Sequence, residues 1–180
     1  MRSIPDPGFP GDDGSADPDV AAALAAYARG EEASELTRHN VALAVLQDAR
    51  VLVPVVALLG EVEYDEQGLA RDKTSDMAAV LMTGRDGRTA LLAFTSTAAL
   101  DAWDGSNTGG SNKDGDARPV PVTIQQAAQA AIQEQAAALL LDVAGPVLFV
   151  VEAEDLRALA LGHRLVPLDD GHWAWVKAPV

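Results

Sequence analysis

Two apolar segments joined by a short polar turn constrain the fold of this chain more than any other feature. The segments AAVLMTG and TALLAFT flank the tetrapeptide Arg85-Asp86-Gly87-Arg88. An Asp-Gly pair between apolar runs is a strong hairpin signal, because both central positions of a type I′ turn need positive φ. The sequence therefore predicts an antiparallel hairpin with a type I′ turn at Asp86-Gly87.

Further strands are predicted on both sides of the hairpin. The upstream segment VLVPVVALLG is β-branched and apolar, but Pro54 in its middle indicates an edge position or a bulge, because proline lacks a ladder donor. Downstream, ALLLDV and VLFVVE are predicted buried strands separated by a turn at Gly145-Pro146, and HRLVPL is a last extended piece.

Three longer segments have the composition and spacing of helices. VAAALAAYARG is rich in strong helix formers and ends at Gly30, and IQQAAQAAIQEQA follows Thr123, which can cap it. Between them, EASELTRHNVALAVLQDA carries an apolar stripe near helical spacing, formed by Leu36, Val41, Leu43, Ala44 and Leu46.

Two shorter helices are also expected. TAALDAW can be capped by Ser96 or Thr97, and its Leu100 and Trp103 are predicted to pack back on the sheet. DLRALALG begins at Glu154 or Asp155 and ends at Gly162, so short helices alternate with the later strands.

This order of elements predicts the fold class. Helices and strands mixed along the chain indicate an α/β protein, bordering on α+β, with a mixed β-sheet packed by helices. A length of 180 residues fits a single domain. Residues 1–18 are acidic, rich in Pro and Gly and without periodicity, so they are predicted to form a disordered acidic arm before a domain at 19–180.

Composition excludes several function classes. The formal net charge of -14 would repel phosphate backbones, so no nucleic-acid partner is expected. The chain contains no cysteine, which excludes disulfides, thiolate nucleophiles, thiolate zinc sites and iron–sulfur clusters. The start of the chain lacks a signal-peptide apolar region, and no apolar run has the length of a membrane span, so a cytoplasmic protein with no membrane partner is expected.

An ordered set of segments resembles a known family. LVPV, MAAVLMTGRDGRTALLAFTSTAALDAW, ARPVPVTIQQAA and LLLDVAGPVLFVVEAEDLRALA occur in this order. Together they resemble the SseB N-terminal-domain family, in the version common in actinobacterial proteins, from about Asp19 to about Leu165. The resemblance implies a shared fold but no established biochemical role, since the family is named for an enhanced-serine-sensitivity phenotype.

Two labels attached to members of that family imply specific functions. One links members to type III secretion, which makes a secretion-associated accessory protein one alternative. The other associates members with rhodanese-type sulfur transfer, which needs a cysteine persulfide. Because this chain has no cysteine, sulfurtransferase activity is excluded.

No metal, cofactor or phosphate site is predicted. His39, His163 and His172 stand at none of the usual ligand spacings. The segment from Asp104 to Asp116 has oxygen-bearing side chains but lacks the ligand order of a calcium loop, so a surface loop is predicted. The glycines of TGRDGR fit a tight hairpin and lack the context of a phosphate-binding loop.

Four residues stand out as a candidate groove. Asp142 and Glu152 lie at the ends of predicted strands, Arg118 precedes the segment that leads into a central helix, and Trp103 ends a short helix. One interpretation is structural: Arg118 pairs with Asp142 or caps a nearby helix end. The other is functional: Arg118 and Trp103, with Asp142 and Glu152, line a shallow groove for a partner peptide or a small acidic ligand.

Trp173 and Trp175 form a second aromatic feature near the end of the chain. Period-two spacing places both rings on one face of an extended strand. The rings are therefore expected to lie in the core or in a homodimer contact.

These observations favour a non-enzymatic protein-interaction or scaffold module, with an unidentified protein partner or self-association, because no catalytic constellation is present. The alternative is a small-molecule binding or regulatory domain, related to amino-acid metabolism, with a groove around Arg118.

Overall fold

The elements alternate along the chain as the sequence indicates. The computed structural model describes residues 8–30, 34–58, 63–64, 70–71, 76–103 and 117–177. In chain order the elements are α1 (Pro18–Arg29), α2 (Glu35–Leu46), β1 (Arg50–Leu58), β2 (Glu63–Tyr64), β3 (Ala70–Arg71), β4 (Asp76–Ala79), β5 (Leu81–Thr83), β6 (Thr89–Ala93), α3 (Thr97–Asp101), β7 (Arg118–Thr123), α4 (Ile124–Gln133), β8 (Ala138–Leu141), β9 (Phe149–Glu152), α5 (Ala153–Ala160), β10 (His163–Pro167) and β11 (Trp173–Lys177). No helix within these ranges has the length and apolar character needed to cross a membrane.

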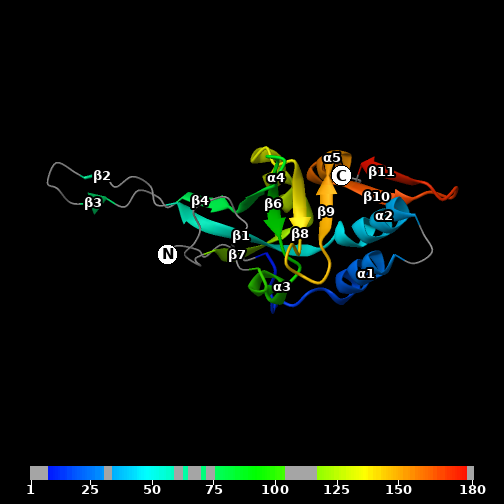
Figure 1. Ribbon diagram of the computed structural model, residues 1–180, viewed down its shortest axis with the longest axis horizontal. Helices are drawn as coiled ribbons and strands as arrows, with labels where there is room; N and C mark the ends of the chain where they lie inside the picture. The colour runs from blue at the N-terminus through cyan, green and yellow to red at the C-terminus, as the bar shows by residue number, and fades with distance from the viewer. Residues whose placement is uncertain are drawn as a thin grey trace.

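A four-stranded mixed sheet forms the centre of the fold. Its strand order is β5-β6-β8-β9, and Figure 1 shows β6, β8 and β9 side by side. β6 and β8 run parallel, with Leu91 opposite Leu139, and the other two pairs are antiparallel. The predicted α/β class with a mixed sheet packed by helices is confirmed.

The predicted hairpin is present, but its turn is of another type. β5 and β6 pair antiparallel on either side of the loop. Gly87 has φ 81°, whereas Asp86 is not among the residues with positive φ, so the type I′ prediction is wrong. The N–H of Gly84 donates to the Arg88 carbonyl, and the N–H of Gly87 donates to the Gly84 carbonyl. A three-residue loop of this kind needs only one left-handed residue, which is Gly87.

β1 is a central strand, which corrects the edge position predicted from Pro54. β1 lies between β4 and β7 in a three-stranded sheet. Leu52 exchanges both backbone hydrogen bonds with Phe94, and the Pro54 carbonyl accepts from the N–H of Val80. The nitrogen of Pro54 faces the side of β1 on which the hydrogen-bonding partner changes from Phe94 to Val80. The absent N–H of Pro54 therefore removes no hydrogen bond between β1 and β7.

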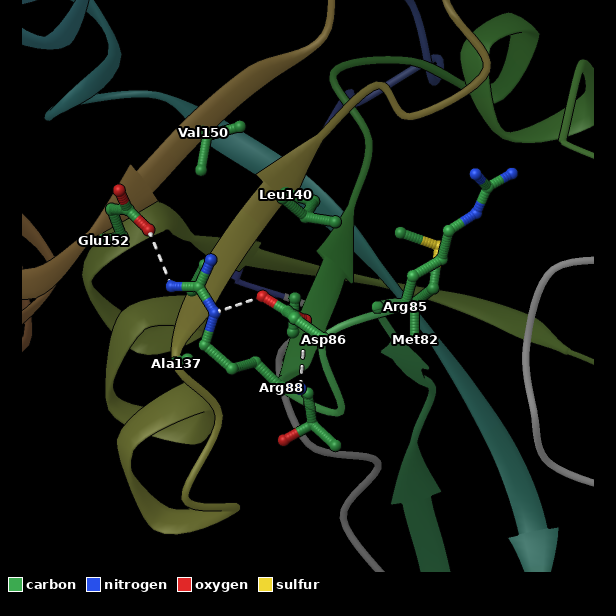
Figure 2. Close-up of a pocket in the computed structure, with 12 residues that line it drawn as sticks. Met82, Arg85, Asp86, Arg88, Ala137, Leu140, Val150 and Glu152 are labelled. Atoms are coloured by element: carbon green, nitrogen blue, oxygen red, sulfur yellow. Dashed lines mark hydrogen bonds and ion pairs between the residues drawn. The ribbon is translucent and has the colours of Figure 1, made fainter.

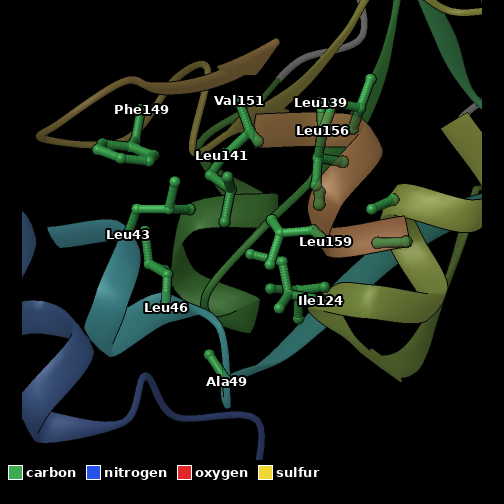
Figure 3. Packing of buried hydrophobic residues seen from close by; sticks show 14 of the residues in the cluster. Leu43, Leu46, Ala49, Ile124, Leu139, Leu141, Phe149, Val151, Leu156 and Leu159 are labelled. Carbon is green, nitrogen blue, oxygen red and sulfur yellow. The ribbon is translucent and has the colours of Figure 1, made fainter. Parts of the chain in front are cut away.

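Most helices pack on one face of the four-stranded sheet. Side chains alternate along β6, so Leu91 and Ala93 enter a large cluster with residues from α1, α2, α4 and α5. Figure 3 shows the centre of this cluster, where Leu43, Leu46, Ile124, Leu139, Leu141, Phe149, Val151, Leu156 and Leu159 are labelled.

The opposite face has a smaller cover. Leu92 and Phe94 point to this side and form a second cluster with Leu52, Val80 and Ala99. Leu100 and Trp103 pack against that cluster, which confirms their predicted contact with the sheet. The rings of Phe94 and Trp103 lie 5.7 Å apart between centroids.

The helix caps follow the sequence signals. Gly30 ends α1 with φ 72°, Ser96 caps α3, and Thr123 forms a reciprocal capping box with Gln126. The apolar stripe predicted for α2 is only partly correct. Leu43 and Leu46 are buried, but Leu36 is 70% exposed and Val41 is 47% exposed, since Leu36 lies in the first turn of α2 and Val41 points away from the core.

Part of the segment assigned to a disordered arm lies against the domain. Arg50 donates to the Asp12 carboxylate and to the Ser15 carbonyl, both at 2.7 Å. The N–H of Thr97 donates to the Gly14 carbonyl at 2.8 Å. These contacts give residues 8–17 a defined position, and residues 1–7 lie outside the described residues.

The end of the described chain forms a hairpin that packs on the large cluster. β10 and β11 pair antiparallel, and Gln47, the residue after α2, both donates to and accepts from the backbone of Leu165. Trp173 and Trp175 are partly buried against the core. The structure thus places both rings against the core, one of the two locations expected for them.

The glycine at position 87 provides a test of the hairpin. We expect Gly87→Ala to lower the free energy of unfolding by about 1 kcal/mol, because alanine is strained at positive φ. Gly87→Asn should cost less, since asparagine tolerates this conformation. Urea unfolding of the three proteins measures the order, and equal stability of the alanine variant and the parent would contradict this description of the turn.

Candidate functional site

One end of the less covered sheet face is open to solvent. α3 and Trp103 cover this face near Phe94, at the end of β6. Toward the hairpin loop, four apolar side chains from four neighbouring strands remain partly exposed: Met82, Ala90, Leu140 and Val150. Met82 pairs with Ala90 and Leu140 pairs with Val150 across adjacent strands, so the four form a continuous floor.

A hollow of about 390 Å³ lies over this floor. Arg85, Asp86 and Arg88 from the hairpin loop form one part of its rim, and Glu152 at the end of β9 forms another (Figure 2). We call the floor residues and these four rim residues the open-face groove. It joins an apolar base to four charged groups.

The charges of the rim are partly paired with one another. Arg88 donates through Nε to Asp86 Oδ2 at 2.6 Å and through its backbone N–H to Asp86 Oδ1 at 3.1 Å. The hydrogen bond from the Arg88 side chain holds the pKa of Asp86 below its ordinary value, and the same bond raises the pKa of Arg88. A Glu152 oxygen lies 3.6 Å from Arg88, beyond hydrogen-bond range.

Arg85 differs from Arg88 in its surroundings. Figure 2 shows Arg88 extending toward Glu152, while Arg85 extends in another direction, on the side of Met82. Arg85 is exposed and forms no ion pair with any residue that the structure describes. Its guanidinium is available to an anionic group from outside the chain.

The chemistry of the groove suits binding. Its lining contains no histidine, serine or cysteine, and within the described residues the hydroxyl of Thr89, which also lines it, forms no hydrogen bond to a basic group. An apolar floor with a small number of polar groups at the rim is the usual composition of a binding site.

The structure separates the four residues that the sequence singled out. Glu152 lies on the rim of the open-face groove. Asp142 follows the last residue of β8, and because β9 runs antiparallel to β8, Glu152 pairs with Ala138 at the other end of that strand. Trp103 packs on Phe94, and Arg118 is exposed at the start of β7. A single groove formed by all four is therefore wrong.

Asp142 has a structural partner other than Arg118. Its buried carboxylate accepts the N–H of Thr95 at 2.8 Å and the Thr95 hydroxyl at 2.7 Å. Burial raises the pKa of Asp142, although the two Thr95 hydrogen bonds act in the opposite direction. In the described part of the chain Arg118 forms no ion pair with Asp142, which corrects that interpretation.

A cluster around His39 has no signal in the sequence spacing. His39 Nε2 lies 3.0 Å from Asp155 Oδ2, and Trp175 Nε1 donates to Asp155 Oδ1 at 3.0 Å. The ring of His39 stacks on Phe149 at 4.8 Å between centroids. The hydrogen bond with His39 lowers the pKa of Asp155. The cluster joins α2, α5, β9 and β11, so its evident role is to hold these elements together.

No metal site is seen among the residues that the structure describes, which contain no group of three or more His, Cys, Asp or Glu side chains placed to hold an ion. The predicted surface loop from Asp104 to Asp116 lies outside the described residues.

Comparison with known families agrees with this architecture. The model of the SseB protein N-terminal domain matches residues 20–158. The chain belongs to the SseB protein N-terminal domain family. Searches of the curated proteins and of the solved structures give no match. The SseB match includes every residue of the open-face groove, whereas the β10–β11 hairpin lies beyond it.

Asp142 provides a test of the buried contact with Thr95. We expect Asp142→Ala to lower the free energy of unfolding by about 1–3 kcal/mol, because the buried N–H of Thr95 loses its acceptor. Asp142→Asn can still accept from that N–H, and asparagine tolerates the φ of 54° at this position.

The two variants also differ in pH dependence. Because burial raises the pKa of Asp142, its contribution to stability is full below the ordinary value of 3.8 and is lost as pH rises through the folded-state pKa. The Asp142→Asn variant has no carboxyl group at this position and does not lose this stability. The free energy of unfolding of the variant, measured relative to that of the parent, should therefore increase from about pH 4 to about pH 7. Urea unfolding across this range measures the change, and a constant difference would contradict the raised pKa.

Proposed function

We propose that the protein is a non-enzymatic protein-interaction module and that the open-face groove is its binding surface. The observation that carries the proposal is the apolar floor formed by Met82, Ala90, Leu140 and Val150, which no helix of the described residues covers. Apolar side chains that meet across neighbouring strands form a continuous surface, and such surfaces mark interaction sites more often than scattered ones do.

The charge around the groove supports the same proposal. The whole chain carries a formal net charge of -14, but the rim contributes two guanidinium groups and two carboxylates, which balance. A partner that covers the groove therefore buries no excess of negative charge. Covering the floor removes apolar surface from water, at about 25 cal/mol per Å², and so adds a favourable term to the free energy of binding.

A catalytic role has less support. The lining of the groove offers carboxylates, guanidiniums and the hydroxyl of Thr89, which no basic group of the described residues hydrogen-bonds, and Asp86 and Arg88 already bind each other. Sulfur transfer has no cysteine to carry it.

One observation favours a second candidate, a small-molecule binding domain. The hollow of about 390 Å³ falls within the range of roughly 300–1,000 Å³ that ligand pockets occupy. Arg85 could hold a carboxylate there, as in a metabolite related to the amino acids. This candidate places the ligand in the open-face groove, away from Arg118. A metabolite that raises the melting temperature of the parent but not of a blocked groove variant would favour it.

Blocking the floor tests the interaction proposal. Ala90 lies between Met82 of β5 and Ala138 of β8, so Ala90→Arg should fill the groove with a long charged side chain. We expect a protein partner captured from the native host to bind this variant at least about tenfold more weakly, a loss of about 1.4 kcal/mol. Affinity capture at physiological salt, followed by titration of the purified partner, measures the effect.

Leu161→Arg is the matched control for this substitution. Leu161 is 71% exposed just after α5, outside the groove, so the same side chain there should leave partner binding unchanged. Equal capture by the Ala90→Arg variant and the parent would overturn the open-face groove as the binding surface.

A further inference from the structure

We propose that the partner segment that enters the open-face groove carries a carboxylate beside an aliphatic or aromatic side chain, and that Arg85 pairs with that carboxylate. This inference rests on the proposed function and adds the chemistry of the partner. It follows from the different states of the two arginines on the rim.

Arg88 is already engaged within the chain. Both oxygens of Asp86 accept from Arg88, one from its backbone N–H and one from Nε. Glu152 adds a second carboxylate near the same guanidinium, at 3.6 Å. An incoming carboxylate at Arg88 would have to approach two negative groups, so Arg88 is a poor anchor for an acidic partner.

Arg85 has the opposite character. It extends on the side of Met82, apart from the cluster of Arg88, Asp86 and Glu152 (Figure 2). Within the described chain no carboxylate neutralises it. The groove is therefore polarised, with an unpaired positive charge toward β5 and a net negative charge toward β9.

This polarity fixes how a partner segment would lie. Its apolar side chain would rest on the floor, next to Met82 and Leu140, and its carboxylate would point to the β5 side, where Arg85 can offer two parallel N–H groups. Charge complementarity of this kind determines orientation and selectivity more than affinity.

The inference opposes what the overall charge alone would predict. A chain of net charge -14 attracts basic peptides without specificity. Binding of acidic peptides would therefore result from a local feature, the guanidinium of Arg85. Binding of basic peptides would result from the overall negative charge of the chain.

A random 12-residue peptide library displayed on phage can separate these cases. The full chain serves as the target at physiological salt, and peptides that also bind the Ala90→Arg variant are removed. We expect the remaining peptides to be enriched in Asp or Glu within a few residues of an aliphatic or aromatic residue. Arg85→Gln should weaken their binding about two- to fivefold, as expected for an exposed ion pair. Arg118→Gln, which removes an exposed arginine outside the groove, should not.

Each outcome bears on one of the two proposals. Peptides that require the open groove but lack carboxylates, or that bind the Arg85→Gln variant as tightly as the parent, overturn the inference and leave the proposed function standing. If no peptide remains after removal of those that bind the Ala90→Arg variant, both proposals are overturned. Circular dichroism confirms the folding of each variant, and Val150→Lys, on the same floor, replaces Ala90→Arg if that variant does not fold.

Discussion

The parallel pairing of β6 with β8 is the constraint on which the rest of the structure depends. Two parallel neighbours cannot be joined by a tight turn, so the chain must leave the sheet and return in the same direction. It does so through α3, β7 and α4. α4 then lies with α1, α2 and α5 on one face, where Leu91, Ala93, Leu139 and Leu141 are buried. The helical cover of the sheet is consequently much larger on this face than on the other.

The open-face groove is the result of that asymmetry. The alternate residues of β6 and β8 point to the opposite face. Among the described residues, α3, Trp103 and a few neighbours cover that face, and this cover ends before the hairpin loop. Met82, Ala90, Leu140 and Val150 are thus apolar because they belong to a central sheet, and partly exposed because no helix in the described part of the chain reaches them. The hairpin loop adds Arg85 at the margin. Fold and candidate function share one physical cause.

The features that could be predicted from the sequence are those with local causes. The hairpin and the caps at Gly30, Ser96 and Thr123 depend on neighbouring residues, and the structure has them all. The central position of β1 depends on hydrogen bonds to residues distant in the sequence, first Phe94 and then Val80, which local sequence patterns do not indicate. For the site, the sequence placed Asp142 and Glu152 at the ends of strands and so at the margin of the sheet. Because β9 runs antiparallel to β8, the two residues lie at opposite ends of this pair of strands. Arg85 and Arg88 lay in a recognised turn, and only the fold shows that this turn borders an apolar floor.

The most direct test of the account is to observe the floor itself while a partner binds. The chain has three methionines, Met1, Met77 and Met82, so labelling with [¹³C-methyl]methionine gives few signals. Met82 lies in the floor, whereas Met77 is exposed and not part of the groove. We expect a partner protein purified with this chain to shift or broaden the Met82 methyl signal and to leave the Met77 signal unchanged. A stable complex in which Met82 keeps its free-state signal would contradict it.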